Sequence, residues 1–262
     1  MTAPEEIKSC CTAAYGQDAV ALVLGESYHP GGLALTRRLA DVVGLRSGNR
    51  VADIASGLGT TACTLASEYD VTVDGVDLGE STVERARTAA EIAGLSGKVR
   101  FHLGDAERLP LPDNMFGALV CECAFCTFPD KAAAAAEFAR VLRSGGRVGF
   151  TDVTVVETGL PDELTTLGAW VACIADARSV RTYIEILAGA GLRTVRTETH
   201  DDALARMIDQ IEARVGVLRM TAADRLTEAG VDTDAVLRYT ALARLAVTDG
   251  LLGYALFIAE KP

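Results

Sequence analysis

Two glycines and two later acidic residues have the types and spacing needed to hold a nucleoside. Gly57 and Gly59 lie where an apolar segment gives way to a helical one, so the backbone there can turn tightly and approach a ligand. Asp77 follows the next apolar segment, where a carboxylate can accept hydrogen bonds from both ribose hydroxyls. Asp105 follows the third apolar segment, where its carboxylate can accept a hydrogen bond from the exocyclic amine of adenine. The small side chain of Ala106 leaves room for the adenine ring. The two glycines alone could simply form a tight turn. Candidate binding residues after three successive apolar segments, however, indicate a ligand site.

A sheet must bring these places together. From residue 50 onward, apolar segments alternate with amphipathic ones, which predicts an α/β fold with a mostly parallel sheet and crossover helices. Because the carboxyl ends of parallel strands meet at one edge, the candidate residues should converge there. We expect strands at 50–54, 72–76, 99–102, 116–122, 147–153, 193–199 and 254–260, and helices at 60–68, 80–93, 131–142 and 180–190.

The segments 155–178 and 201–250 do not fit this alternation, and residues 1–45 precede it. Residues 1–45 are predicted to be mostly helical with a break at 29–32, and residues 201–250 are rich in Ala, Leu and Arg at helical spacing. We therefore expect an N-terminal helical cap at 1–45, the α/β domain at 46–200 and 251–262, and a helical insert at 201–250. The insert could cap a pocket or form a homodimer interface.

The segment Asp-Ile-Ala-Ser-Gly-Leu-Gly at 53–59 resembles the first motif of the class I S-adenosylmethionine-dependent methyltransferases, with alanine in place of the first glycine. The resemblance implies a Rossmann-like, doubly wound sheet with one antiparallel strand, and S-adenosylmethionine as the cofactor. It also implies a cofactor-binding set. That set comprises Asp53, Ala55, Gly57 and Gly59 at the methionine part, Asp77 and Leu78 at the ribose, Asp105 and Ala106 at adenine, and Cys121 and Glu122 near the transferred methyl group.

A nicotinamide-dependent dehydrogenase is the competing interpretation of a glycine motif after a strand. Counted from Gly57, the last glycine of the dinucleotide fingerprint would fall on Ala62. The Gly-Asp-Ala element at 104–106 also has no explanation in a dehydrogenase. The methyltransferase interpretation is therefore favoured.

The cysteines suggest a particular acceptor. Cys123 and Cys126 follow the fourth expected strand, Cys173 lies in a later segment, and Cys10 and Cys11 lie near the start. Thiolates are soft ligands for metals and metalloids, although free cysteines are often only small buried apolar residues. This pattern resembles the arsenite methyltransferases, which implies that Cys123, Cys126 and Cys173 hold the arsenic that is methylated. The cysteine that this family carries near the end of the chain is missing here.

His29 is the remaining candidate for chemistry. It precedes Pro-Gly-Gly at 30–32 and could act as a base or orient a substrate, or it could be an ordinary turn residue. Paired Cys-x2-Cys motifs are absent, so we expect no structural zinc site.

Composition limits the partners. The chain has 262 residues, of which 49% are apolar, and a formal net charge of −11. An acidic surface repels phosphate backbones, so we expect no nucleic-acid substrate. The N-terminus lacks signal-peptide features and no apolar stretch of about 18 residues occurs, so we expect a cytoplasmic protein with reduced cysteines and no membrane association.

Three functions remain open from the sequence. The first is methyl transfer to a small molecule such as thiolate-bound arsenite. The second is methyl transfer to oxygen, nitrogen or carbon of an organic metabolite, with cysteines that only pack. The third is a non-catalytic protein that binds the cofactor or a metalloid.

Overall fold

The central sheet has the predicted Rossmann-like arrangement. The computed structural model describes residues 3–15, 18–25, 28–157, 160, 164, 174 and 176–262. In these ranges seven strands form one sheet in the order β3-β2-β1-β4-β5-β7-β6, and β7 runs antiparallel to both of its neighbours. The strands are β1 (Arg50–Ile54), β2 (Thr72–Asp77), β3 (Val99–Leu103), β4 (Phe116–Glu122), β5 (Leu142–Val155), β6 (Arg193–Thr199) and β7 (Leu252–Glu260).

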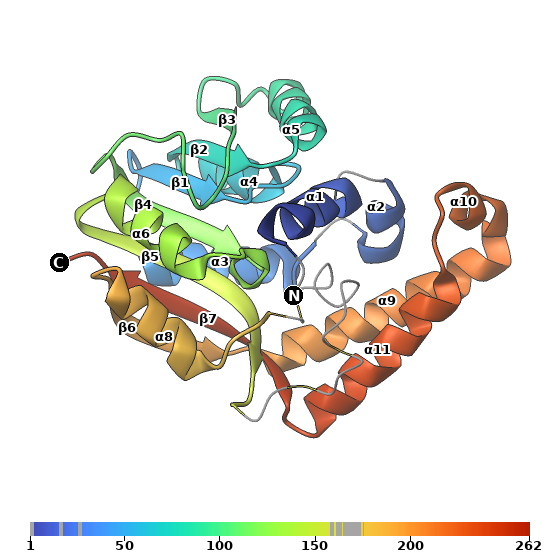
Figure 1. Ribbon diagram of the computed structural model, residues 1–262. Coiled ribbons are helices and arrows are strands. Elements are labelled where there is room, and N and C mark those ends of the chain that lie inside the picture. Colours follow the sequence, from blue (N-terminus) through green and yellow to red (C-terminus); the bar gives the residue numbers. More distant parts are fainter. Residues whose placement is uncertain are drawn as a thin grey trace.

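Helices cover both faces of the sheet (Figure 1). One core lies beneath α3 (Gly32–Val43), α4 (Thr60–Glu68) and α5 (Glu80–Ile92), and the other beneath α6 (Lys131–Val141) and α8 (Val180–Gly189). Because helices cover both faces, most residues of the inner strands are buried, including polar ones such as Asp53 and Asp152. Successive side chains along a strand point to opposite faces, so Val51 enters the first core and Ala52 the second.

Local signals set several helix ends. The side chain of Asp130 accepts a hydrogen bond from the Ala133 amide at 2.8 Å and starts α6. Gly44 ends α3 with a φ of 84°, and its amide donates to the Ala40 carbonyl.

The observed strands extend beyond two of the predicted ones. β5 begins at Leu142 instead of residue 147, because Leu142 pairs with Phe116 before a register shift leads to the pair Arg147–Ala118. β7 begins at Leu252 instead of residue 254, because it pairs with the extended end of β5 as far as Val155.

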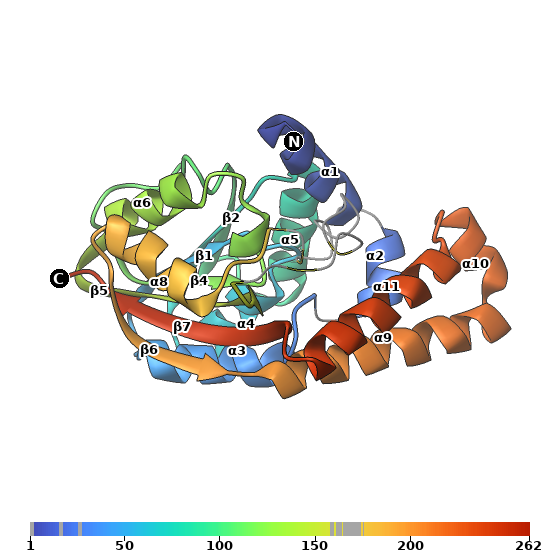
Figure 2. The same cartoon turned by 60° about the horizontal axis from the view of Figure 1, so that its bottom comes forward.

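Helices outside the sheet layers flank its carboxyl edge (Figures 1 and 2). α1 (Pro4–Tyr15) and α2 (Asp18–Leu24) belong to the N-terminal segment, and α9 (Asp201–Thr221), α10 (Ala223–Glu228) and α11 (Thr233–Thr248) belong to the predicted insert. α9 and α11 lie side by side and extend away from the sheet, with α10 at the far end. α2 packs on α9, where Arg214 donates a hydrogen bond to the Val23 carbonyl at 3.0 Å.

The division into a cap, a domain and an insert stays a prediction. Among the helices of the described residues, none has the length and apolar character that crossing a bilayer requires.

Candidate active site

A cavity of about 290 Å³ lies at the carboxyl edge of the sheet. The ends of β1, β2 and β4, the loop after β3, and the N-terminal helices all contribute to its wall. Of the residues predicted to bind the cofactor or substrate, those that line it are Asp53, Ala55, Gly57, Asp77, Leu78, Asp105, Ala106, Glu122, Cys123 and His29. The structure therefore brings the three predicted nucleoside-binding places to one cavity.

The loop after β1 reaches the cavity through left-handed backbone conformations. Ala55 has a φ of 57°, which favours glycine and costs about 1–2 kcal/mol for an alanine. Gly57 has a φ of 53° and lines the cavity. Gly59 has a φ of 81° and starts α4, and a Cβ there would collide with the ring of Phe101. Gly59 is not a lining residue, and its conformation lets the chain turn into α4, so its cofactor contact stays a prediction.

Asp77 is held in place by backbone amides. Its Oδ2 accepts a hydrogen bond from the Gly57 amide and its Oδ1 accepts one from the Gly79 amide, both at 2.9 Å. Burial raises the pKa of Asp77, and the amide hydrogen bonds oppose that rise. The carboxylate is thereby fixed between the glycine loop and the start of α5.

Two buried polar atoms beside the cavity lack a partner. The Oδ2 of Asp53 and the Oγ of Ser56 make no hydrogen bond within the described part of the chain. Burial raises the pKa of Asp53 well above its usual range, and the nearby charges of Glu122 and Asp77 raise it further. A buried acceptor without a partner is costly, so this end of the cavity suits a ligand that brings a hydrogen-bond donor and a positive charge.

Asp105 is joined to the first helix. Lys8 of α1 donates to its Oδ2 at 2.8 Å and also pairs with Glu107. Burial lowers the pKa of Lys8, but the hydrogen bonds and charges of these two carboxylates outweigh it and raise the pKa. The contact places α1 over the part of the cavity that was predicted to hold adenine.

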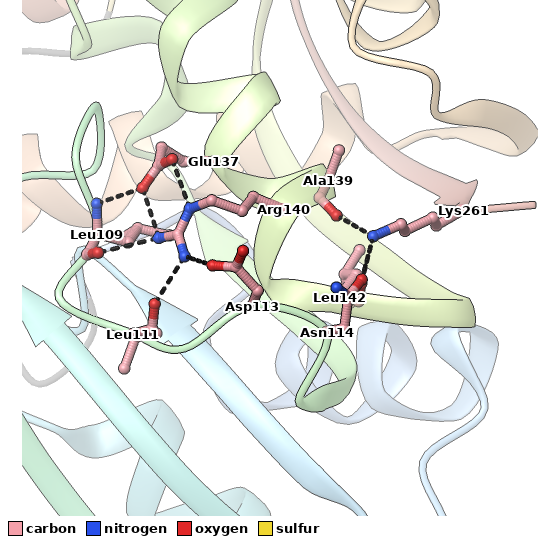
Figure 3. A network of polar contacts seen from close by, with 9 residues as sticks. All are labelled: Leu109, Leu111, Asp113, Asn114, Glu137, Ala139, Arg140, Leu142 and Lys261. Carbon is pink, nitrogen blue, oxygen red and sulfur yellow. Dashed lines mark hydrogen bonds and ion pairs between the residues drawn. The ribbon is translucent and has the colours of Figure 1, made fainter.

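The loop that begins at Asp105 is anchored from α6 (Figure 3). Arg140 donates to the carbonyls of Leu109 and Leu111 at 3.0 and 2.9 Å, and it pairs with Glu137 and Asp113. Glu137 in turn accepts a hydrogen bond from the Leu109 amide at 2.7 Å. A single guanidinium thus holds the loop backbone and one of its side chains.

Glu122 and His29 form a buried pair on the cavity wall. The side chains of Glu122 and His29 are 4% and 11% exposed, and their Oε2 and Nε2 atoms lie 3.6 Å apart. Glu122 also accepts hydrogen bonds from Thr61 Oγ1 at 2.6 Å and from Thr36 Oγ1 at 3.1 Å. The carboxylate is therefore oriented by two hydroxyls, and it can stabilise a positive charge on the imidazole.

The cysteines do not gather at the cavity as predicted. Cys121 lies on the opposite face of the sheet from Glu122, because neighbouring strand residues alternate, and it packs in the second core. Burial, reinforced by the charge of Asp152, raises the pKa of the Cys121 thiol, which favours the neutral form. Cys126 is buried in the first core, and its amide donates to Asp152. Neither thiol lines the cavity, so the structure does not bring Cys121 and Cys126 together with the other predicted site residues.

Two other thiols do reach the cavity. Cys123 lines it with a φ of 52°, a left-handed conformation rare for a cysteine, and Cys11 lines it from α1. Cys173 lies outside the described residues. Within the described residues, no group of three or more His, Cys, Asp or Glu side chains could hold a metal ion.

Sequence reasoning missed four residues that position the site. Lys8, Thr36 and Thr61 contact the site acids, and Asp152 holds the turn η1 (Phe125–Thr127) that follows Cys123. Lys8 lies 97 residues from Asp105, so no local spacing pointed to the pair.

Several known proteins similar to this chain are named as methyltransferases. Residues 52–150 match the family model described as a methyltransferase domain. The chain is 31% identical over 233 residues to 27-O-demethylrifamycin SV methyltransferase of Amycolatopsis mediterranei, a match that covers 87% of this chain and 83% of that protein. It is 30% identical over 196 residues to phosphoethanolamine N-methyltransferase 3 of Arabidopsis thaliana, covering 72% of this chain but only 39% of that longer protein.

Solved structures agree on the fold. Phosphoethanolamine N-methyltransferase 2 of Haemonchus contortus, solved in complex with S-adenosyl-L-methionine, matches with a TM-score of 0.80 at 19% identity. The match covers 96% of this chain and 57% of that one.

Proposed function

The chain belongs to the class I S-adenosylmethionine-dependent methyltransferases, and from this we propose that it methylates a hydroxyl group of a small organic molecule with His29 as the general base. The observation that carries the proposal is the buried His29–Glu122 pair, which lies on the same cavity as Asp53, Asp77 and Asp105. The similarity to a methyltransferase whose name places its methyl group on oxygen supports a hydroxyl acceptor.

The residues present fit the cofactor. The unpartnered Oδ2 of Asp53 suits the ammonium of the methionine part, Asp77 suits the ribose hydroxyls, and Asp105 with Ala106 suits adenine. When bound, S-adenosylmethionine supplies an electrophilic methyl group on a positively charged sulfur. Glu122, the fourth lining carboxylate, lies beside His29, and the helices α1 and α2 exclude water from one side of the cavity.

His29 supplies the proton chemistry in this proposal. In the tautomer with hydrogen on Nδ1, that nitrogen donates to the Pro30 carbonyl at 3.3 Å and leaves a lone pair on Nε2, which lies 3.6 Å from Glu122 Oε2. Nε2 takes the proton of the acceptor hydroxyl as the oxygen bonds to the methyl carbon and the bond from that carbon to sulfur breaks, and Glu122 stabilises the imidazolium that results. The alternative organic acceptors, nitrogen and carbon, would depend less on such a base.

The test compares His29→Gln and Glu122→Gln with the native enzyme. We expect transfer of labelled methyl groups to a hydroxylated acceptor to fall by about 10²–10⁴-fold in His29→Gln, while the dissociation constant for S-adenosylmethionine changes little. Glu122→Gln should also lower kcat, because the imidazolium of His29 would lose the carboxylate that stabilises it. An unchanged kcat in His29→Gln, at unchanged cofactor affinity, would exclude His29 as the base.

A thiol-bound metalloid is the second candidate acceptor, and one observation favours it. Cys11 and Cys123 both line the cavity, and their thiols are the kind of ligand that arsenite prefers. On this hypothesis, Cys11→Ser with Cys123→Ser should abolish arsenite binding and arsenite-dependent use of S-adenosylmethionine. Cys63→Ser, on α4 and away from the cavity, is the matched control. Arsenite binding that survives the double substitution would count against this candidate.

A further inference from the structure

The charge on the cavity wall selects among acceptors. Four carboxylates line the cavity, those of Asp53, Asp77, Asp105 and Glu122. The lining residues in the described part of the chain include one lysine, Lys8, which is paired with both Asp105 and Glu107. In the proposed function Asp53, Asp77 and Asp105 contact the cofactor, so Glu122 is the lining carboxylate that remains to face an acceptor.

The sequence around the cavity has the same bias. Apart from Lys8 and the turn at 104–106, the lining residues fall within three stretches, 9–36, 51–84 and 109–130. None of these stretches contains a lysine or an arginine, although the chain has 25 such residues. Two cations lie behind the wall, and both are engaged with other groups. Arg214, next to Gly25, donates to the Val23 carbonyl. Lys131 donates to the Phe128 carbonyl and pairs with Asp176.

The remaining wall of the cavity is largely apolar or aromatic. Tyr15 and Tyr28 form a tilted ring pair with centroids 6.2 Å apart. Ala21 lies on the wall with them, and the loop after β4 adds Phe128 and Pro129. Such a wall binds a carbon skeleton by burial of apolar surface, with few polar groups to fix orientation.

We infer that the acceptor is an uncharged hydroxyl compound with an apolar body, and that phosphorylated or carboxylated acceptors are excluded by the carboxylates of the wall. This inference rests on the proposed function, since it describes the molecule that His29 would deprotonate. It separates this chain from its similar proteins that are named for phosphoethanolamine.

The test uses matched pairs that differ in charge and measures binding without turnover. Protein loaded with S-adenosylhomocysteine is titrated with tyrosol and para-hydroxyphenylacetate, and with geraniol and geranyl monophosphate, and binding is followed by ligand-observed NMR. We expect the uncharged member of each pair to bind about tenfold more tightly or better at low ionic strength. Added salt should narrow the difference, because it screens the carboxylates.

Two variants on one helix complete the experiment. Thr12 lines the cavity from α1, whereas Ser9 on the same helix is exposed and is not a lining residue. Thr12→Lys should improve binding of the anionic members by about tenfold, and Ser9→Lys should not.

The outcomes separate the two proposals. The inference is overturned if an anionic compound binds the native protein with the same affinity as the uncharged compound of its pair. It is also overturned if none of the compounds binds while S-adenosylhomocysteine is bound. Because no step of this experiment needs a base, a failure of His29 as the base would show only in the turnover of His29→Gln.

Discussion

At the scale of residues, two carboxylates of the cavity, those of Asp77 and Asp53, differ in their hydrogen-bond partners. Asp77 has an amide donor on each oxygen, so its position does not depend on a ligand. Asp53 leaves one buried oxygen without a partner, so the cofactor-free protein keeps an unfavourable group there. Asp77 therefore provides a fixed recognition point, and Asp53 gains from cofactor binding.

The Asp77→Ala substitution tests the recognition point. Loss of hydrogen bonds to a buried ligand hydroxyl costs about 1–3 kcal/mol, so the dissociation constant for S-adenosylmethionine should rise by about 5–150-fold. Isothermal titration calorimetry measures the change, and Asp249→Ala on an exposed turn is the control. Equal affinities for Asp77→Ala and native protein would mean that the ribose binds elsewhere.

The Asp53→Asn substitution tests the cost of the buried charge. Because the pKa of Asp53 is raised in the folded protein, the folded state holds its proton more tightly than the unfolded state does, and native stability falls as pH rises above about 4. Removing the charge should therefore raise the melting temperature more at pH 8 than at pH 5. Calorimetry of cofactor-free protein gives both values. An identical shift at the two pH values would show that Asp53 has an ordinary pKa, and cofactor affinity should fall in either case.

At the scale of elements, the cofactor loops depend on neighbours that the loops themselves do not reveal. The loop after β3 is fastened to α6 by Arg140, and the C-terminal Lys261 joins Asn114 of the same loop to the Ala139 and Leu142 carbonyls, each at 2.7 Å (Figure 3). These contacts lie outside the cavity. They decide how firmly the residues after Asp105 are held.

The Arg140→Lys substitution tests this anchoring. A lysine keeps the charge but cannot satisfy two carbonyls and two carboxylates at once, so the protein should lose about 1–2 kcal/mol of stability. For a domain of this size that is a fall of about 2–8 °C in the melting temperature. Cofactor affinity should fall a few-fold, because the loop that carries Asp105 would be held less firmly. Arg143→Lys, at an exposed position, is the control, and equal stability of the two variants would refute the anchoring role.

The strand pattern explains how much of the site could be predicted. Asp53, Asp77 and Asp105 were predictable because parallel strands end at one edge, and a carboxylate there needs no long-range information. The alternation rule could also have separated Cys121 from Glu122, since adjacent strand residues cannot both face the ligand.

Other features needed the folded chain. The Thr36–Glu122 contact spans 86 residues, and no local pattern encodes it. Ala55 adopts a left-handed conformation that usually favours glycine, and an alanine at that position gave no sign of it in the sequence.

At the scale of the whole molecule, the cavity joins parts that are far apart in the chain. α1 closes one side through Lys8, α2 lines another side and packs on α9, and the sheet supplies the floor. α9 and α11 carry α10 away from the cavity (Figure 2). Ligand binding should therefore reduce the mobility of α1 and have much less effect on α10, at the end of the helical arm formed by α9, α10 and α11.

Cofactor binding should stabilise the molecule unevenly. At 100 times its dissociation constant, S-adenosylmethionine should add about 2.7 kcal/mol of stability, which corresponds to a rise of about 5–11 °C in the melting temperature. Hydrogen–deuterium exchange should slow in α1, because Lys8, Thr12 and Tyr15 line the cavity, while α10 exchanges as before. Asp77→Ala at the same cofactor concentration should lose most of this protection. Equal protection of α1 and α10 would instead mean that the arm closes on the cofactor together with the first helix.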